Sequence, residues 1–124
     1  MTTRRVLVID DEEAIQEIIQ ACLEDLGGWE VLVAGSGSQG LLIAASEPLD
    51  GILLDVSMPE MNGFETLQKL QENLTTQKIP VTLLTARVQP EDKEQFAQLG
   101  IAGLILKPFD PLTLVEQVAE VFGW

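Results

Sequence analysis

The chain has 124 residues, with 20 acidic and seven basic side chains, a formal net charge of −13 and no histidine. We expect one domain over residues 1–124, because a chain of this length can bury roughly two-thirds of its unfolded surface. The lack of any basic cluster argues against direct binding to nucleic acid, in which Lys and Arg replace counterions on phosphates. The lack of histidine excludes Ser-His and Cys-His catalysis and the commonest zinc ligand.

The same composition argues against a membrane protein. No apolar run approaches the ~20 residues needed to span a bilayer, and the first residues enter a strand without the layout of a signal peptide. We therefore expect no membrane association and a cytoplasmic location. The single cysteine, Cys22, rules out an internal disulfide, and its place on an apolar helical stripe predicts burial rather than reactivity.

The beginning of the chain predicts a strand followed by a helix. An apolar strand at 4–9 stops at the acidic run Asp10-Asp11-Glu12-Glu13. The acidic residues suit the positive end of a helix dipole, and Gly27-Gly28 ends the helix. Between them, apolar residues recur three and four positions apart, as in an amphipathic helix, at Ile15, Ile18, Ile19, Cys22, Leu23 and Leu26.

The next stretch predicts two strands separated by a second helix. A strand is expected at 29–33, and Ser36 is a suitable cap for a helix that ends before Pro48. The run Gly51–Leu54 is short, apolar and bounded by turn residues, which indicates a strand buried on both faces of a parallel sheet. That strand ends at Asp55.

The rest of the chain continues the alternation of helices and strands. We expect a helix from Asn62-Gly63, a strand at 81–84, a short helix from Pro90 to Gly100, a strand at 103–106 and a last helix started by Asp110-Pro111. Five strand–helix pairs predict an α/β fold, with a parallel sheet and helices on both of its faces.

In such a sheet all strands point the same way, so their carboxyl ends share one edge. At that edge the sequence places Asp10, Asp11, Asp55, Thr85 and Lys107. Singly, each has an ordinary explanation as a helix cap, a strand-end threonine or a solvated charge. Jointly, three carboxylates, one hydroxyl and one ammonium form a set that suits one chemistry.

Charge indicates which chemistry this is. Two carboxylates about 4 Å apart repel by roughly 4 kcal/mol at an effective dielectric constant near 20. A divalent cation relieves this repulsion, and an all-oxygen site favours Mg²⁺ or Mn²⁺. Carboxylates, a metal and a lysine together are typical of a phosphoryl-transfer site, where a carboxylate can be the nucleophile.

The residues Asp10-Asp11, Asp55, Thr85-Ala86 and Lys107-Pro108-Phe109 together resemble the signature of the receiver domain of bacterial two-component response regulators, of the chemotaxis-regulator type. The resemblance extends over essentially the whole chain. It implies a flavodoxin-like (βα)5 fold, a doubly wound parallel sheet with the strand order 2-1-3-4-5.

The resemblance also implies a role for each acidic residue. Asp55 matches the phosphoacceptor, and Asp11 and Asp55 match direct ligands of Mg²⁺. Asp10 matches a ligand that acts through water, and Ser57 matches a ligand through its backbone carbonyl.

Three further positions carry expectations from the same resemblance. Thr85 and Lys107 match residues that bind the phosphoryl group, and Lys107-Pro108 matches a cis peptide bond. Leu104 departs from the pattern, because many members of the family carry tyrosine or phenylalanine there. The departure puts in doubt the response of an aromatic side chain to movement of Thr85, which is usual in the family. It does not affect the expectation of phosphorylation itself.

The function implied by the resemblance is that of a phosphoacceptor signalling switch. A sensor histidine kinase, a phosphotransfer protein or a small acyl phosphate would donate the phosphoryl group to Asp55, and the interaction surface would then change. The domain would catalyse only its own phosphorylation and dephosphorylation, and its output partner or domain is unknown. One alternative is an interaction domain that works without phosphorylation. Another is an aspartate-nucleophile phosphatase, which needs a second acid where this chain has Ser57.

Overall fold

Five parallel strands form one sheet in the order β2-β1-β3-β4-β5, in a computed structural model that describes residues 3–56, 63–86 and 98–124. The strands are β1 (Arg5–Ile9), β2 (Glu30–Ala34), β3 (Gly51–Asp55), β4 (Val81–Thr85) and β5 (Gly103–Leu106). The predicted α/β fold with the strand order 2-1-3-4-5 is therefore confirmed.

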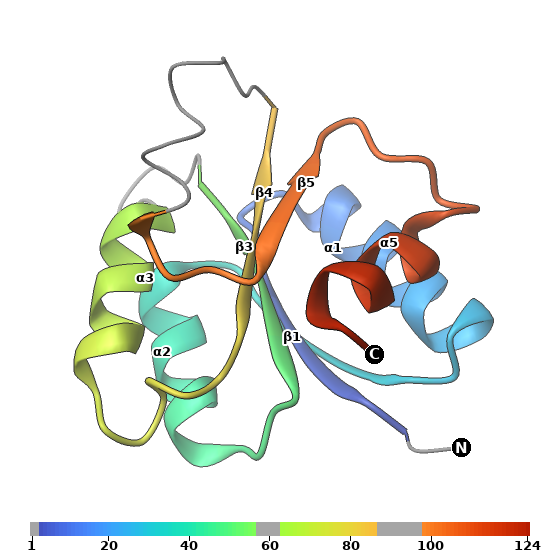
Figure 1. Ribbon diagram of the computed structural model, residues 1–124. Coiled ribbons are helices and arrows are strands. Elements are labelled where there is room, and N and C mark those ends of the chain that lie inside the picture. The colour runs from blue at the N-terminus through green and yellow to red at the C-terminus, as the bar shows by residue number, and fades with distance from the viewer. Residues whose placement is uncertain (1–2, 57–62, 87–97) are drawn as a thin grey trace.

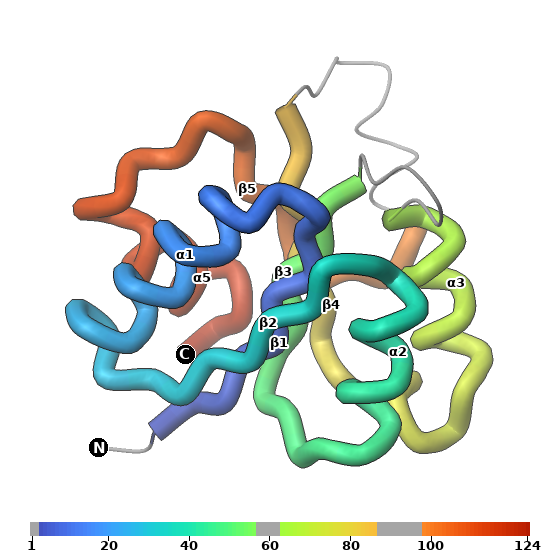
Figure 2. The backbone as a smooth tube through the Cα atoms, turned by 180° about the vertical axis from the view of Figure 1, so that it is seen from behind, coloured from blue at the N-terminus to red at the C-terminus, as the bar shows by residue number. Residues whose placement is uncertain are grey.

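Helices cover both faces of the sheet, as Figures 1 and 2 show from opposite sides. Helices α2 (Gly37–Ser46) and α3 (Gly63–Glu72) lie on one face. Helix α1 (Glu13–Ala21), the π-helical turn η1 (Cys22–Leu26) that continues it, and α5 (Leu114–Phe122) lie on the other. The helix expected from Pro90 to Gly100 falls mostly on residues 87–97, outside the described residues. None of the helices in the described part of the chain is long and apolar enough to cross a membrane.

The core has two halves because successive residues of a strand point to opposite faces. In β1, Val6 and Val8 pack toward α1 and α5, whereas Leu7 and Ile9 pack toward α2 and α3. All five residues of β3 are buried, which explains why its sequence is a continuous apolar run rather than an alternating one. The rigid centre of the sheet thus ends directly at Asp55.

The predicted cap of the second helix agrees with the structure, whereas the predicted start of the last helix differs. The Ser36 cap is confirmed, since its hydroxyl accepts a hydrogen bond from the Gln39 N–H at 3.2 Å. The last helix begins at Leu114 rather than at Asp110-Pro111, because the carboxylate of Asp110 accepts the Leu112 N–H at 2.9 Å and forms a turn instead.

The apolar stripe of the first helix is also narrower than predicted. Ile18 and Leu26 are 41% and 60% exposed, while Ile19, Cys22 and Leu23 are buried as expected. For Leu26 the reason is the wider π-helical turn, which moves it off the stripe set by a period of 3.6 residues. Cys22 is a free, buried thiol whose pKa is raised by desolvation and by the nearby charge of Asp25, in keeping with a structural role.

Candidate metal and phosphorylation site

The register of the sheet brings the polar strand ends together. Ile9 pairs with Leu54, so Asp10 and Asp55 follow on neighbouring strands. On the other side, Asp55 pairs with Leu84, which directly precedes Thr85. Thr85 pairs with Leu106, so Lys107 is the next residue beyond β5. The four strand ends therefore form one continuous row, as the parallel sheet predicted.

Three carboxylates meet at the centre of this row. One carboxylate oxygen from each of Asp10, Asp11 and Asp55 lies within 4.8 Å of the others. Asp10 is fully buried and Asp55 is 3% exposed, whereas Asp11 is exposed. Carboxylates this close repel one another, more strongly because two of them are buried, so the cluster needs positive charge nearby.

Lys107 supplies part of that charge. Its Nζ donates to Asp10 Oδ2 at 2.9 Å and to Asp55 Oδ1 at 3.3 Å. Desolvation by burial lowers the pKa of Lys107, but the hydrogen bond to Asp10 and the charges of Asp10 and Asp55 outweigh it, so the pKa is raised overall. The ammonium is thus cationic at neutral pH and bridges two of the three acids. The Lys107–Pro108 peptide is cis, which confirms that expectation.

Backbone contacts fix the other members of the row. Thr85 is buried at the end of β4, and its carbonyl accepts the Lys107 N–H at 2.8 Å. Gly63, the first residue of α3, packs against the end of β3 so closely that a Cβ there would lie 2.4 Å from the Asp55 carbonyl oxygen. A glycine is therefore required at this contact, which places α3 beside Asp55.

The structure brings together Asp10, Asp11, Asp55 and Lys107, and it places Thr85 at the adjacent strand end. Ser57, which was predicted to offer its backbone carbonyl, lies outside the described residues. Sequence reasoning missed Gln16, whose side-chain amide donates to the backbone carbonyl of Asp10.

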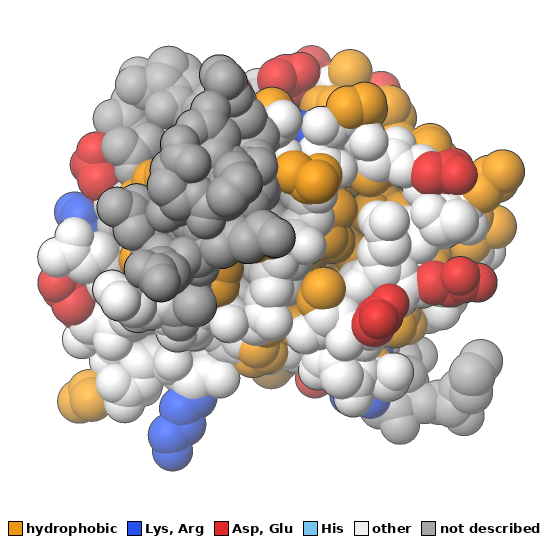
Figure 3. Space-filling view, turned by 45° about the horizontal axis from the view of Figure 1, so that its top comes forward, with side chains coloured by type: hydrophobic (Ala, Val, Ile, Leu, Met, Phe, Trp, Pro, Cys, Tyr) orange, Lys and Arg blue, Asp and Glu red, His pale blue; other side chains and the backbone are white. Residues whose placement is uncertain are grey.

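A mostly apolar cavity of about 310 Å³ adjoins the site at Lys107. Ile15 and Ile18 of α1 form one side, and Phe109 and Pro111, which follow β5, form the other. Figure 3, in which the top of the molecule in Figure 1 is tilted toward the viewer, shows hydrophobic side chains gathered on this face with acidic side chains around them. Ala86 and Lys107 line the same cavity and so connect it to the site.

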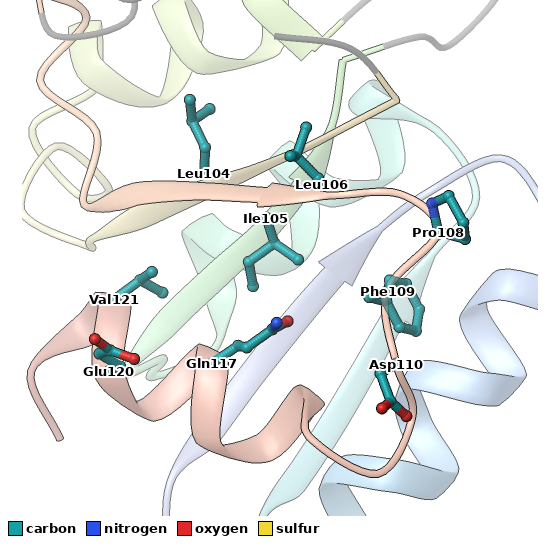
Figure 4. Close-up of a pocket in the computed structure, with 9 residues that line it drawn as sticks. All are labelled: Leu104, Ile105, Leu106, Pro108, Phe109, Asp110, Gln117, Glu120 and Val121. Carbon is teal, nitrogen blue, oxygen red and sulfur yellow. The ribbon is translucent and has the colours of Figure 1, made fainter.

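A second cavity, of about 460 Å³, lies between β5 and α5 (Figure 4). Ile105 points toward α5, whereas Leu104 and Leu106 project from the opposite face of β5. Leu104 is half-buried and packs with the core that faces α2 and α3. Leu104, the residue at which the resemblance implied a departure from an aromatic ring, thus belongs to that core.

The donor set fits a hard divalent cation. All three side chains offer carboxylate oxygens, and together they carry three negative charges against the single charge of Lys107. Oxygen-rich, strongly negative sites bind Mg²⁺, Mn²⁺ or Ca²⁺ rather than soft metals. The cluster of Asp10, Asp11 and Asp55 is therefore a potential metal-binding site.

Comparison with known proteins defines the class. Residues 6–119 match the family model of the response regulator receiver domain, and the chain belongs to this family. Receiver domains are the phosphoacceptor switches of two-component signalling.

Relatives and solved structures agree with this membership. Response regulator Rre1 of Synechocystis sp. is 36% identical over 106 residues, which cover 86% of this chain and 46% of that protein. The chain spans about half the length of the first curated relatives that it matches. The structure of the chemotaxis response regulator CheY4 of Vibrio cholerae is 33% identical, with a TM-score of 0.88 over 97% of this chain and 99% of that one.

A second similar structure bears on the metal. The receiver domain of sensor histidine kinase PA1611 from Pseudomonas aeruginosa is 25% identical, with a TM-score of 0.84 over 99% of this chain and 100% of that one. It is described with a magnesium ion coordinated in its active site cleft.

Proposed function

We propose that residues 1–124 form one receiver domain that accepts a phosphoryl group on Asp55, with Mg²⁺ bound by the neighbouring acids. The donor is the phosphohistidine of a sensor kinase or phosphotransfer protein, or a small acyl phosphate. The observation that carries the proposal is the convergence of three carboxylates within 4.8 Å, two of them bridged by Lys107. The magnesium ion described in the PA1611 receiver domain supports the choice of metal.

The proposed transfer balances without a change of oxidation state. A carboxylate oxygen of Asp55 attacks phosphorus and forms a new P–O bond, while the bond from phosphorus to the donor nitrogen or oxygen breaks. The electron pair of the broken bond leaves with the donor, and Asp55 has no proton to lose because it reacts as the carboxylate. A bound divalent cation supplies positive charge that neutralises the carboxylates and the transferring oxygens.

The chain's own residues position the reacting groups. Lys107 already donates to Asp55 Oδ1, and it can move one hydrogen bond to an oxygen of the incoming phosphoryl group. Thr85, at the end of the adjacent strand, offers a hydroxyl to another phosphoryl oxygen. Asp11, Asp55 and the backbone carbonyl of Ser57 would hold the cation directly, and Asp10 would act through a water molecule. In this assignment the domain catalyses only its own phosphorylation and dephosphorylation.

The test is incubation with a small acyl phosphate and Mg²⁺, followed by intact-mass measurement. We expect one added phosphoryl group on the wild type, and none on Asp55→Asn or in the presence of a chelator. Asp25→Asn is a matched control, because Asp25 is an exposed acid on η1, outside the cluster. Equal labelling of Asp55→Asn and the wild type would contradict the assignment.

The same experiment separates the two alternatives. An interaction domain that works without phosphorylation would leave the wild type unlabelled. An aspartate-nucleophile phosphatase would release many equivalents of phosphate per chain with repeated turnover. A receiver domain accumulates a phosphorylated form and releases phosphate only as that form decays.

A further inference from the structure

Gln16 makes an unusual contact with the first acid of the cluster. It lies half-buried in α1, and its side-chain amide crosses back to donate to the backbone carbonyl of Asp10. The backbone N–H of Gln16 donates to the Glu12 carbonyl at 3.0 Å, so Gln16 is also anchored in the first turn of the helix. A single residue thus closes the loop between β1 and α1 through both its backbone and its side chain.

The carbonyl that Gln16 holds belongs to the peptide that joins Asp10 to Asp11. The rest of Asp10 is already fixed, because Oδ1 accepts the Glu12 N–H at 2.9 Å and Oδ2 accepts Lys107 Nζ at 2.9 Å. Asp11 differs, since its exposed carboxylate makes no hydrogen bond within the described residues. The direction of the Asp11 side chain therefore depends on the orientation of the peptide before it.

We propose that Gln16 is a positioning residue for the metal site, which holds the Asp10–Asp11 peptide so that the Asp11 carboxylate faces the other two acids. This inference rests on the proposed function, because it assumes that the cluster binds a divalent cation. The physical reason is preorganisation: a ligand already aimed at the cation loses less conformational freedom on binding. Gln16 itself touches neither the cation nor the phosphoryl group in this proposal.

The chain offers a matched control in Gln39. Its side-chain Oε1 accepts the Gly35 N–H at 2.8 Å, in the loop before α2. A Cβ built on Gly35 would lie 3.6 Å from Gln39 Oε1 and 3.7 Å from Gln16 Nε2, so both amides lie against the same glycine. Each glutamine side chain hydrogen-bonds to one backbone group of a neighbouring loop. Only Gln16 bonds to the peptide that joins Asp10 and Asp11.

The experiment compares Gln16→Met with Gln39→Met, both of which remove an amide of similar size without changing charge. The affinity for Mn²⁺ and Mg²⁺ is measured by titration without any phosphoryl donor, and thermal melts without metal report on folding. We expect Gln16→Met to lose about tenfold in metal affinity, at the lower end of the range for outer ligand-orienting residues. Gln39→Met should keep wild-type affinity, and the amide resonance of Asp11 should shift only in Gln16→Met.

Phosphorylation provides a second readout. For Gln16→Met, the metal concentration that gives half the maximal labelling rate should rise, while the rate at saturating metal should approach that of the wild type. If Gln16→Met does not fold, Gln16→Asn replaces it, since the shorter side chain keeps an amide but cannot reach the same carbonyl.

Two results would overturn the inference: unchanged metal affinity in Gln16→Met, or an equal loss in Gln39→Met, which would indicate a general effect of loop stability. A wild type that binds no divalent cation contradicts the proposed metal site itself and the inference with it. The wild-type titration, which comes first, distinguishes the two failures.

Discussion

The two ends of the sheet are built from opposite kinds of interaction. At the carboxyl ends of the strands, three acids crowd around one lysine. At the amino ends, aromatic rings pack together: Trp29 meets Trp124 edge to face with centroids 5.2 Å apart, and Phe122 stacks on Trp124 at 4.7 Å. The Arg4 guanidinium lies 4.9 Å from the centre of the Trp124 ring. The start of β1 and the C-terminus lie on this side of the sheet (Figure 1).

Glycines make the aromatic end possible. Gly123 adopts a left-handed conformation with φ of 73°, which lets the chain turn back so that the Trp124 N–H donates to the Ala119 carbonyl at 2.8 Å. Gly51 opens β3 beside Phe122, and a Cβ there would lie 2.9 Å from the ring. The rings can therefore close over the ends of the strands without strain.

The comparison shows a division between stability and chemistry. Gathered carboxylates repel one another, and a bound cation would relieve that repulsion, whereas the half-buried rings stabilise the fold without any ligand. Because the two groups lie at opposite ends of the same strands, changes at one end should leave the property of the other unaffected. Stability and metal affinity measured on the same variant test that independence.

The largest effect is expected at the aromatic end. Trp124→Ala removes the ring that contacts Trp29, Phe122 and Arg4, and should lower the free energy of unfolding by about 2–3 kcal/mol. Urea unfolding measures this loss, and Leu74→Ala, at an 83% exposed residue, serves as the control. Divalent-cation affinity of folded Trp124→Ala should match the wild type. A parallel loss of metal affinity would show that the two ends are coupled.

At the charged end, Lys107→Met should increase the affinity for a divalent cation by about tenfold, or ~1.4 kcal/mol. Lys107 contacts Asp10 and Asp55, so in the proposed site it would compete with the cation for these two carboxylates. Labelling by acyl phosphate should nevertheless slow, because a donor to the phosphoryl oxygens is lost. Calorimetric titration checks the affinity, with Lys78→Met, at an exposed lysine outside the site, as the control.

The same competition predicts a pH dependence. Because the pKa of Lys107 is raised above its usual 10.5, the ammonium stays charged, and its stabilising contacts stay intact, up to that pH. Competition from the lysine should therefore be constant between about pH 7 and 9 and decline only as pH rises through the raised pKa. A wild-type affinity that increases at pH 8, with no such increase in Lys107→Met, would contradict this account.

Mg²⁺ should stabilise the wild type against heat, since it relieves repulsion that exists only in the folded state. At ten times its dissociation constant, a ligand that binds only the native state adds about 1.4 kcal/mol. For a domain of this length, that corresponds to a rise in Tm of roughly 5 °C. Thermal melts at matched ionic strength measure the shift, which Asp11→Asn should reduce and Asp25→Asn should preserve. The absence of a shift at millimolar Mg²⁺ would mean that the acids do not form a metal site.

The sequence predicted the charged end far better than the aromatic one. Asp10, Asp55, Thr85 and Lys107 each follow an apolar run, and the geometry of parallel strands alone places them on one edge. The contact between Trp29 and Trp124 has no such local signal. It depends on how α5 returns across the sheet, and the sequence reading included Trp29 in a strand that begins at Glu30 instead.

Contacts between a helix side chain and the backbone were also beyond the sequence. The acidic run suggested only that negative charge favours the start of α1, yet the helix begins at Glu13 and the Glu12 side chain makes no capping hydrogen bond. The hydrogen bond from Gln16 to Asp10 depends on that starting point, because a shift of one residue would turn the amide away from the carbonyl. Periodicity shows which face of a helix is apolar, but not where its first turn meets the preceding strand.

The smallest effect is expected midway between the two ends, at Thr82 in β4. Thr82 is fully buried, and its hydroxyl has no hydrogen-bond partner within the described part of the chain. A buried, unpaired hydroxyl is costly, so Thr82→Val, which keeps the branched shape, should raise the free energy of unfolding by about 1 kcal/mol. Thr76→Val is the matched control, because the buried Thr76 hydroxyl donates to the Leu70 carbonyl at 2.7 Å and its loss should cost a similar amount. Urea unfolding of both variants, with metal titrations alongside, measures the two effects. If Thr82→Val is destabilised as Thr76→Val is, the Thr82 hydroxyl contributes to the stability of the fold. If the metal affinity of Thr82→Val changes, the centre of the sheet transmits changes to the charged end.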